Sequence, residues 1–154
     1  MKKPKRYFML IIIAIVISIP LIGYLSNLNH TFKELVTDRI PANENIELIT
    51  LIRSSSEKEV EIKDPAQIKQ IMDNLSTTKL VTTSSPDLKN TYSYYIYIKV
   101  GHKQHSRTRY GLTLYSNHYI SIYDIDCKDK YNAQTYKIKS PYSMQMIDDL
   151  YTKQ

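Results

Sequence analysis

The sequence has one cysteine, Cys127, and only three glycines among its 154 residues. A single cysteine cannot form a disulfide within the chain, so a folded domain must depend on its apolar core. Few glycines also leave few positions for positive φ, which phosphate-binding and active-site loops often require. We interpret Cys127 as a partly buried turn residue, with an intermolecular bridge or a reactive thiol as the alternatives.

Acidic residues are absent before Glu34, whereas the first six residues include four cations, Lys2, Lys3, Lys5 and Arg6. These four account for most of the formal net charge of +6. The remainder of the chain is therefore nearly neutral, and the basic composition does not predict a nucleic-acid partner.

No charged residue occurs between Tyr7 and Phe32. The mostly apolar run Tyr7–Leu25 would be about 28 Å long as a helix, which matches the hydrocarbon thickness of a bilayer. We predict that residues 7–25 form an uncleaved transmembrane helix, with a cleaved signal peptide as the alternative. Cations occur only on the N-terminal side of this run, and cytoplasmic ends of membrane helices carry the excess of cations. We therefore predict a single-pass cell-membrane protein, with residues 1–6 in the cytoplasm and the C-terminal domain outside.

Beyond this run the sequence predicts a connector and one domain. Residues 26–45 are interpreted as a juxtamembrane connector, in which Thr31 and Glu34 have the spacing of a capping box before a short helix that ends at Pro41. Residues 46–154 are predicted to form one extracytoplasmic domain, which is long enough for a single core.

The pattern of this domain predicts an α+β fold. Alternating and β-branched segments predict strands at residues 46–53, 59–63, 79–83, 92–100, 107–115, 119–124 and 133–139. Asp64-Pro65 and Ser140-Pro141 each combine an N-cap residue with proline before an apolar helical stripe. We therefore expect a hairpin, a helix and an antiparallel meander, with two helices on one face of the sheet. The repeated strand–cap–helix pattern indicates either a duplicated ββα unit or independent use of the same capping chemistry.

An apolar membrane segment, an Ile-rich first strand, a short hydrophilic turn, a V-x-I strand, an Asp-Pro helix and a Tyr-rich meander occur in that order. Over Ile46–Tyr123 this order resembles small extracytoplasmic families of unknown function in membrane-anchored and lipoprotein chains of Gram-positive bacteria. The chain lacks the anchoring cysteine of the lipoprotein members. The resemblance implies a location and a fold type. It implies no activity, because these families have no assigned activity.

Two groups of side chains come nearest to a metal site. His102 and His105 lie three residues apart in a predicted turn, and a third ligand is not apparent. An acidic segment has some features of a calcium loop but lacks glycine at the sixth position and glutamate at the twelfth; its carboxylates are Asp124, Asp126 and Asp129. We expect solvated turns, no cofactor and no catalytic activity, because phosphate-loop, G-x-S-x-G and H-E-x-x-H motifs are also absent.

Tyrosine is concentrated in the meander, where 11 of the 14 tyrosines lie between Tyr92 and Tyr142. Strict alternation along the strands would place aromatic and basic side chains together on one exposed face. Large aromatic area with directional donors is typical of recognition surfaces, although the same pattern also fits the solvent side of an ordinary sheet. The predicted binding surface comprises Tyr95, Tyr97, Lys99, Arg107, Arg109, Tyr115, Tyr119 and Tyr123.

These features favour a membrane-anchored extracytoplasmic binding or envelope-accessory domain. Its expected partner is a protein or an anionic cell-wall polymer. One alternative is a membrane-bound immunity or accessory protein against a toxin. Another is an exported metal-dependent enzyme that uses His102, His105 or Asp126.

Overall fold

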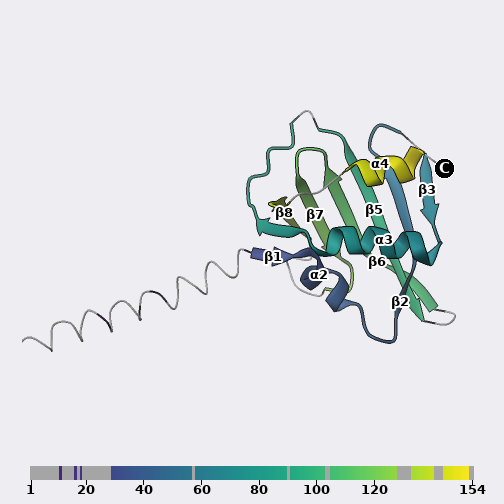
Figure 1. Cartoon of the computed structure of the whole chain (residues 1–154), viewed down its shortest axis with the longest axis horizontal. Coiled ribbons are helices and arrows are strands. Elements are labelled where there is room, and N and C mark those ends of the chain that lie inside the picture. The colour runs from purple at the N-terminus through teal and green to yellow at the C-terminus, as the bar shows by residue number, and fades with distance from the viewer. Residues whose placement is uncertain are drawn as a thin grey trace, which may run out of the picture.

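The computed structural model describes residues 11, 16, 18, 29–56, 58–89, 91–102, 105–127, 133–140 and 144–152. In these residues eight strands form one sheet, ordered β1-β4-β8-β7-β6-β5-β2-β3, with antiparallel neighbours throughout (Figure 1). The strands are β1 (Asn29–Thr31), β2 (Asn45–Arg53), β3 (Glu59–Ile62), β4 (Lys79–Thr82), β5 (Ser93–His102), β6 (His105–Tyr115), β7 (Tyr119–Asp124) and β8 (Ala133–Ile138). The described helical elements are α2 (Phe32–Leu35), the 3₁₀ turn η1 (Thr37–Arg39), α3 (Pro65–Ser76) and α4 (Gln145–Thr152).

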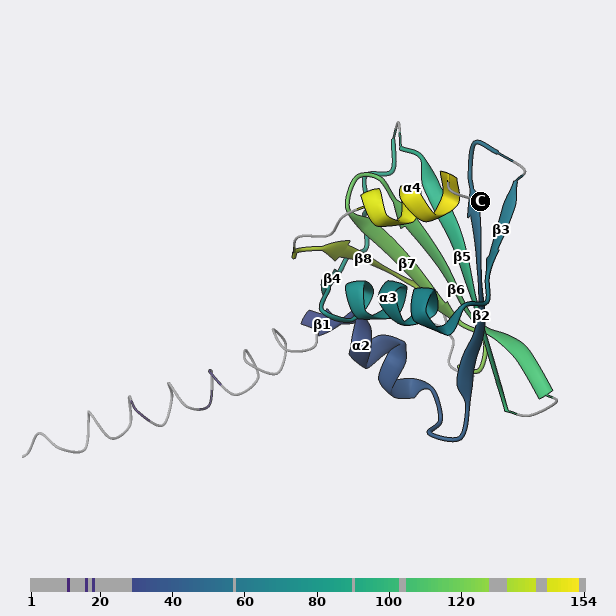
Figure 2. The same cartoon turned by 45° about the vertical axis from the view of Figure 1, so that its right-hand side comes forward.

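The helices cover one face of the sheet. Figures 1 and 2 show α3 and α4 lying across the same side of the strands. Buried residues of α2, α3 and α4 join alternate residues of the strands in one hydrophobic core. The period-two alternation therefore points every second strand residue at the helices.

The opposite face of the sheet is not covered by any helix among the described residues, and we call it the open face. Its central residues are Thr50 and Ile52 on β2, Tyr95, Tyr97 and Lys99 on β5, Gly111, Thr113 and Tyr115 on β6, and Tyr119, Ser121 and Tyr123 on β7.

The start of α3 follows from its sequence. The carboxylate of Asp64 accepts a hydrogen bond of 3.1 Å from the backbone N–H of Ala66, and Pro65 occupies the first helical turn. The apolar stripe that includes Ile68 and Leu75 is buried against the sheet. Both the predicted cap and the predicted stripe are confirmed.

The start of α4 differs from the prediction. This helix begins at Gln145, and residues 141–143 lie outside the described residues. The hydroxyl of Ser140 accepts a hydrogen bond of 2.9 Å from the backbone N–H of Lys79 instead. Ser140 thus joins the end of β8 to the start of β4, and its predicted role as an N-cap is wrong.

The predicted connector contains more structure than a short helix. Thr31 and Glu34 form the expected capping box, with the Thr31 hydroxyl and the Glu34 carboxylate each accepting a backbone N–H. Ahead of this helix, residues 29–31 form β1, which pairs with β4 at one edge of the sheet. A three-residue strand has too short a pattern to be recognised from sequence.

The predicted transmembrane helix requires a correction. In the part of the chain that the structure describes, no helix is long and apolar enough to cross a membrane, and the protein is mostly antiparallel sheet. Of the predicted segment Tyr7–Leu25, the structure describes only residues 11, 16 and 18. The predicted fold class is therefore corrected to a mostly antiparallel eight-stranded sheet with helices on one face.

The repeated pattern in the sequence corresponds to two similar arrangements. The pair β2–β3 is followed by α3, and the pair β7–β8 is followed by α4. These pairs flank the central strands β5 and β6 on opposite sides. Duplication of a ββα unit stays a prediction.

Candidate functional site

The open face exposes three tyrosines near the middle of the sheet. Tyr95, Tyr97 and Tyr123 are 40%, 42% and 41% exposed, whereas most apolar residues of the same strands are buried in the core. Strand register places Tyr97 and Tyr123 on either side of Gly111. A Cβ at Gly111 would contact both rings, at 3.8 Å from Tyr97 Cε1 and 3.9 Å from Tyr123 Cδ1. The glycine thus leaves a gap between the two rings with room for a methyl group, which we call the Gly111 hollow.

The remaining predicted tyrosines extend this surface. Tyr115 and Tyr119 pair across β6 and β7 and are half-buried. The Lys137 ammonium lies 5.9 Å from the centroid of the Tyr119 ring, in the geometry of a cation–π contact. Lys99, also half-buried, lies next to Leu48 on the neighbouring strand. The open face therefore combines aromatic area with few charges.

The two arginines predicted for this surface lie elsewhere. The register of β5 and β6 shifts between Ile98 and Lys99, so that Ile98 pairs with Tyr110 while Lys99 pairs with Thr108. Arg109 is the extra residue of this β-bulge, and a bulge reverses the alternation of the residues beyond it. Arg107 consequently pairs with core-facing Val100. The prediction that both arginines share the tyrosine face is wrong, because strict alternation cannot anticipate a bulge.

The arginines form a charged cluster with three carboxylates at the end of the sheet. Arg107 donates to Glu44 Oε1 at 2.7 Å and to Asp126 Oδ2 at 2.7 Å. Arg109 is only 9% exposed and lies 3.9 Å from Glu44, 3.9 Å from Asp124 and 3.6 Å from Asp126. The guanidinium groups are thus occupied with internal ion pairs. Glu44 was not predicted, because nothing in the connector sequence relates it to β6.

Two members of the cluster, Arg107 and Asp126, and the neighbouring Tyr110 have shifted pKa values. The hydrogen bond from Arg107 lowers the pKa of Asp126, and the hydrogen bonds from Arg107 to Asp126 and Glu44 raise the pKa of the guanidinium. Burial, together with the nearby Asp124 carboxylate, raises the pKa of Tyr110. These shifts favour the charged form of Asp126 and the neutral phenol of Tyr110.

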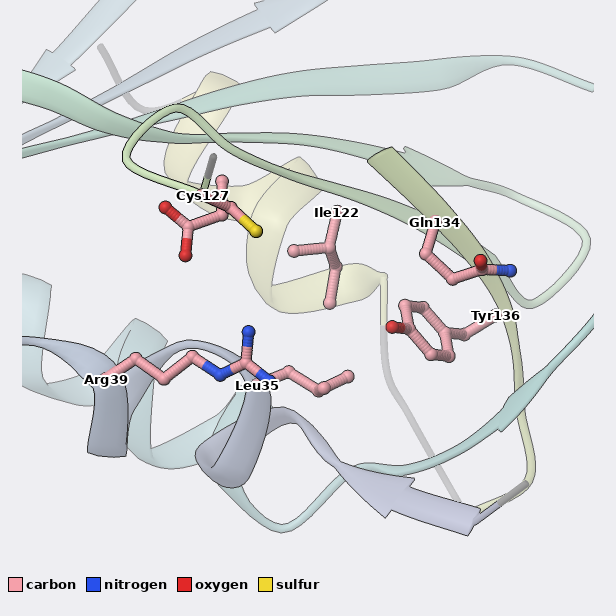
Figure 3. A pocket seen from close by; sticks show the side chains of 7 residues that line it. Leu35, Arg39, Ile122, Cys127, Gln134 and Tyr136 are labelled. Carbon is pink, nitrogen blue, oxygen red and sulfur yellow. The ribbon is translucent and has the colours of Figure 1, made fainter. Parts of the chain in front are cut away.

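A small cavity lies beside this cluster, between η1 and the core-facing side of β7 and β8. Its volume is about 50 Å³, and Figure 3 shows Cys127, Arg39 and Tyr136 around a common space. Leu35, Ile122, Asp124 and Gln134 complete the lining. Sites for drug-sized ligands measure hundreds of Å³, so this cavity has room for ordered water rather than for a substrate.

The weak metal candidates, which we expected to lie in solvated turns, do not form one group within the described ranges. Among the described residues, no group of three or more His, Cys, Asp or Glu side chains is arranged to hold a metal ion. His102 and His105 pair across the β5–β6 hairpin. Asp124 and Asp126 belong to the arginine cluster, and Asp129 lies outside the described residues.

One comparison with known proteins identifies a family. A family model named DUF5301, described as "Domain of unknown function (DUF5300)", matches residues 36–137. The match extends from the end of α2 through β8 and covers more than half of the chain. It confirms the expected relation to a family of unknown function. No curated protein and no solved structure matches the chain. The protein therefore belongs to the DUF5301 family.

Proposed function

We propose that this protein is a non-catalytic binding domain that recognises a protein through its open face. The observation that carries the proposal is the cluster of Tyr95, Tyr97 and Tyr123, which expose similar fractions of their rings around the Gly111 hollow. Tyrosine provides large contact area at a low cost in side-chain entropy, and such residues often dominate the energetics of protein interfaces.

The position of the charges favours a protein over an anionic polymer. Arg107 and Arg109 make internal ion pairs away from the open face. Among the described residues the face carries the cations Lys79, Lys99 and Lys137. Edge strand β3 adds the acidic residues Glu59 and Glu61, of which Glu61 is paired with Lys63. A polyanion would require a surface of one sign, whereas an aromatic surface of mixed charge suits a protein.

Capture experiments with matched double variants test the proposal. The full chain, Tyr97→Ser/Tyr123→Ser and Lys69→Ser/Gln70→Ser would each be used to retain proteins from extracts of the source cells. Lys69 and Gln70 are exposed on α3, on the other side of the molecule, and serve as the control. A protein partner should be lost with the tyrosine variant alone, because each truncation costs roughly 1–3 kcal/mol of binding free energy. Equal retention by all three proteins would contradict the proposal.

Salt dependence separates the two classes of partner. Binding anchored by tyrosines should persist at high ionic strength, whereas binding of an anionic polymer should weaken steeply because salt screens exposed charges. A Lys99→Ala/Lys137→Ala variant should accordingly retain a protein partner. Loss of binding in this variant, together with a steep salt dependence, would favour the polymer.

The location of the domain is a separate part of the proposal. The sequence resemblance to extracytoplasmic families of Gram-positive bacteria supports a function outside the cytoplasm. A C-terminal alkaline phosphatase fusion tests this, since the reporter is active only after export. An inactive fusion that is present at normal levels would contradict it.

A further inference from the structure

We infer that the open face binds the open face of a second copy of this chain, in a symmetric dimer in which two sheets pack face to face. This inference rests on the proposed function, because it identifies the protein that the tyrosine surface recognises. It depends on two independent features of the face: the distribution of large and small side chains, and the position of its charges.

Large and small residues follow an ordered pattern across the strands. One row runs Glu61, Thr50, Tyr97, Gly111, Tyr123 and Ala133, from β3 through β8. The next row runs Glu59, Ile52, Tyr95, Thr113, Ser121 and Thr135. In both rows, the residue of β5 is a tyrosine and the paired residue of β6 is small.

A two-fold axis parallel to the strands, placed between β5 and β6, matches each large residue with a small one. It sets Tyr97 opposite the partner's Gly111 and Tyr123 opposite the partner's Thr50. In the second row it sets Tyr95 opposite the partner's Thr113, and Ile52 opposite the partner's Ser121. Such a surface is complementary to itself, which an isologous interface requires. Packed sheets lie about 10 Å apart with interdigitating side chains, so large residues must meet small ones.

The charges select the same axis. Glu59 and Glu61 belong to β3 at one edge, whereas Lys137 belongs to β8 on the other side of the face. The proposed axis places β3 of one copy over β8 of the other, so that Glu59 lies opposite the partner's Thr135 and one row along the strand from the partner's Lys137. Glu61, which is already paired with Lys63, lies opposite the partner's Ala133. An axis across the strands would instead stack β3 on β3 and bring like charges together, which is unfavourable.

The size of the surface suits a weak dimer. Six strands at a spacing of about 4.8 Å, and about five residues of length in each strand, give a patch of roughly 24 by 17 Å. This planar area of about 410 Å² is half of the roughly 800 Å² that each partner buries in a standard interface, which places the dimer at the weak end of the range. The tyrosines lie in the centre of the patch, where residues that dominate binding usually occur.

The mass of the full chain in solution tests the inference. Sedimentation or light scattering across micromolar concentrations should give twice the mass of the 18.0 kDa chain. Gly111→Arg should raise the dimer dissociation constant at least tenfold, because its side chain fills the hollow. A Cβ at this position has nothing closer than 3.8 Å, so the fold should be retained, as circular dichroism can verify. Gln70→Arg on α3, the matched control, should dimerise like the unmodified chain.

Cross-linking gives a second measurement that does not depend on weakening the dimer. In a Cys127→Ser background, Thr113→Cys places one thiol on each copy. The usual sheet and strand spacings put the backbones of the two copies about 11 Å apart at this position, across the axis. A bismaleimide of that reach should yield a covalent dimer with Thr113→Cys and none with Gln70→Cys.

The outcomes separate this inference from the proposed function. An unmodified chain that is monomeric at every concentration, or a dimer that Gly111→Arg does not weaken, would overturn the second copy as the partner. If the Tyr97→Ser/Tyr123→Ser variant nevertheless fails to capture another protein that the unmodified chain retains, the proposed function still holds. If capture is also unchanged, both are wrong.

Discussion

The phenolic hydroxyl of Tyr94 donates a hydrogen bond of 2.5 Å to Oδ1 of Asp148, and this bond joins β5 to α4 within the core. The Tyr94 ring is fully buried and meets the ring of Tyr151 edge-on, with 5.5 Å between their centroids. Burial, together with the Asp148 carboxylate, raises the pKa of Tyr94 above its ordinary value of 10.0. The hydrogen bond and the ring contact together hold α4 against β5.

Replacing Tyr94 with phenylalanine should lower the free energy of unfolding by about 1.5–3 kcal/mol at pH 7, the range for a hydrogen bond to a charged group. The loss leaves the half-buried Asp148 carboxylate without this donor. Urea melts provide the measurement. Tyr95→Phe, which alters an exposed phenol on the open face, is the control and should have almost no effect. Equal midpoints for both variants would contradict the role of this bond.

The same contact should make the protein sensitive to alkali. Because the pKa of Tyr94 is higher in the folded state than in the unfolded chain, its stabilisation is complete below about pH 10 and is lost as the pH rises further. The free energy of unfolding should therefore fall between pH 10 and 11 more steeply in the unmodified protein than in Tyr94→Phe. Parallel pH profiles would show that this phenol does not contribute.

The two predicted helix caps should respond differently to alanine. Asp64→Ala removes the acceptor for the Ala66 N–H and should cost about 1 kcal/mol of unfolding free energy. Ser140→Ala removes a bond between strand ends, with an expected cost of roughly 0.5–1.5 kcal/mol. Hydrogen exchange separates the causes: the first variant should expose amides at the start of α3, and the second should expose the Lys79 amide. Faster exchange at the start of α4 in the Ser140 variant would restore its interpretation as an N-cap.

The arginines of the charged cluster should contribute unequally. Arg109→Gln leaves the mostly buried Asp124 carboxylate without its ion-pair partner, whereas Glu44 and Asp126 keep Arg107. Removing one partner from a buried pair typically costs about 3–5 kcal/mol. Distances of 3.6–3.9 Å around this guanidinium favour the lower end of that range. Arg107→Gln changes a side chain that is 47% exposed, where exposed pairs contribute roughly 0–1 kcal/mol. Thermal or urea unfolding should rank the variants in this order, and the reverse ranking would contradict the assignment of Arg109 to the buried part of the cluster.

Much of the secondary structure was predictable because its signals are local. The Asp64-Pro65 cap, the Thr31–Glu34 capping box and the β-branched alternation of β7 each depend on neighbours within a few residues, and the structure has all three. Ser140-Pro141 carries the same local signal as Asp64-Pro65. There, the Ser140 hydroxyl instead accepts a hydrogen bond from the backbone N–H of Lys79, which belongs to a strand distant in the chain.

The sequence by itself determined which segments become strands β2 to β8, and that Tyr95 and Tyr97 lie on the same side of β5, since alternation is a property of each strand. Only the tertiary structure decided where the arginines lie. The bulge at Arg109 arises from the pairing of β5 with β6, and it turns Arg107 toward Glu44 and Asp126. Strand order likewise depends on contacts between residues far apart in the chain. The complementary rows of the open face could therefore be recognised only after β2, β5, β6 and β7 were placed side by side.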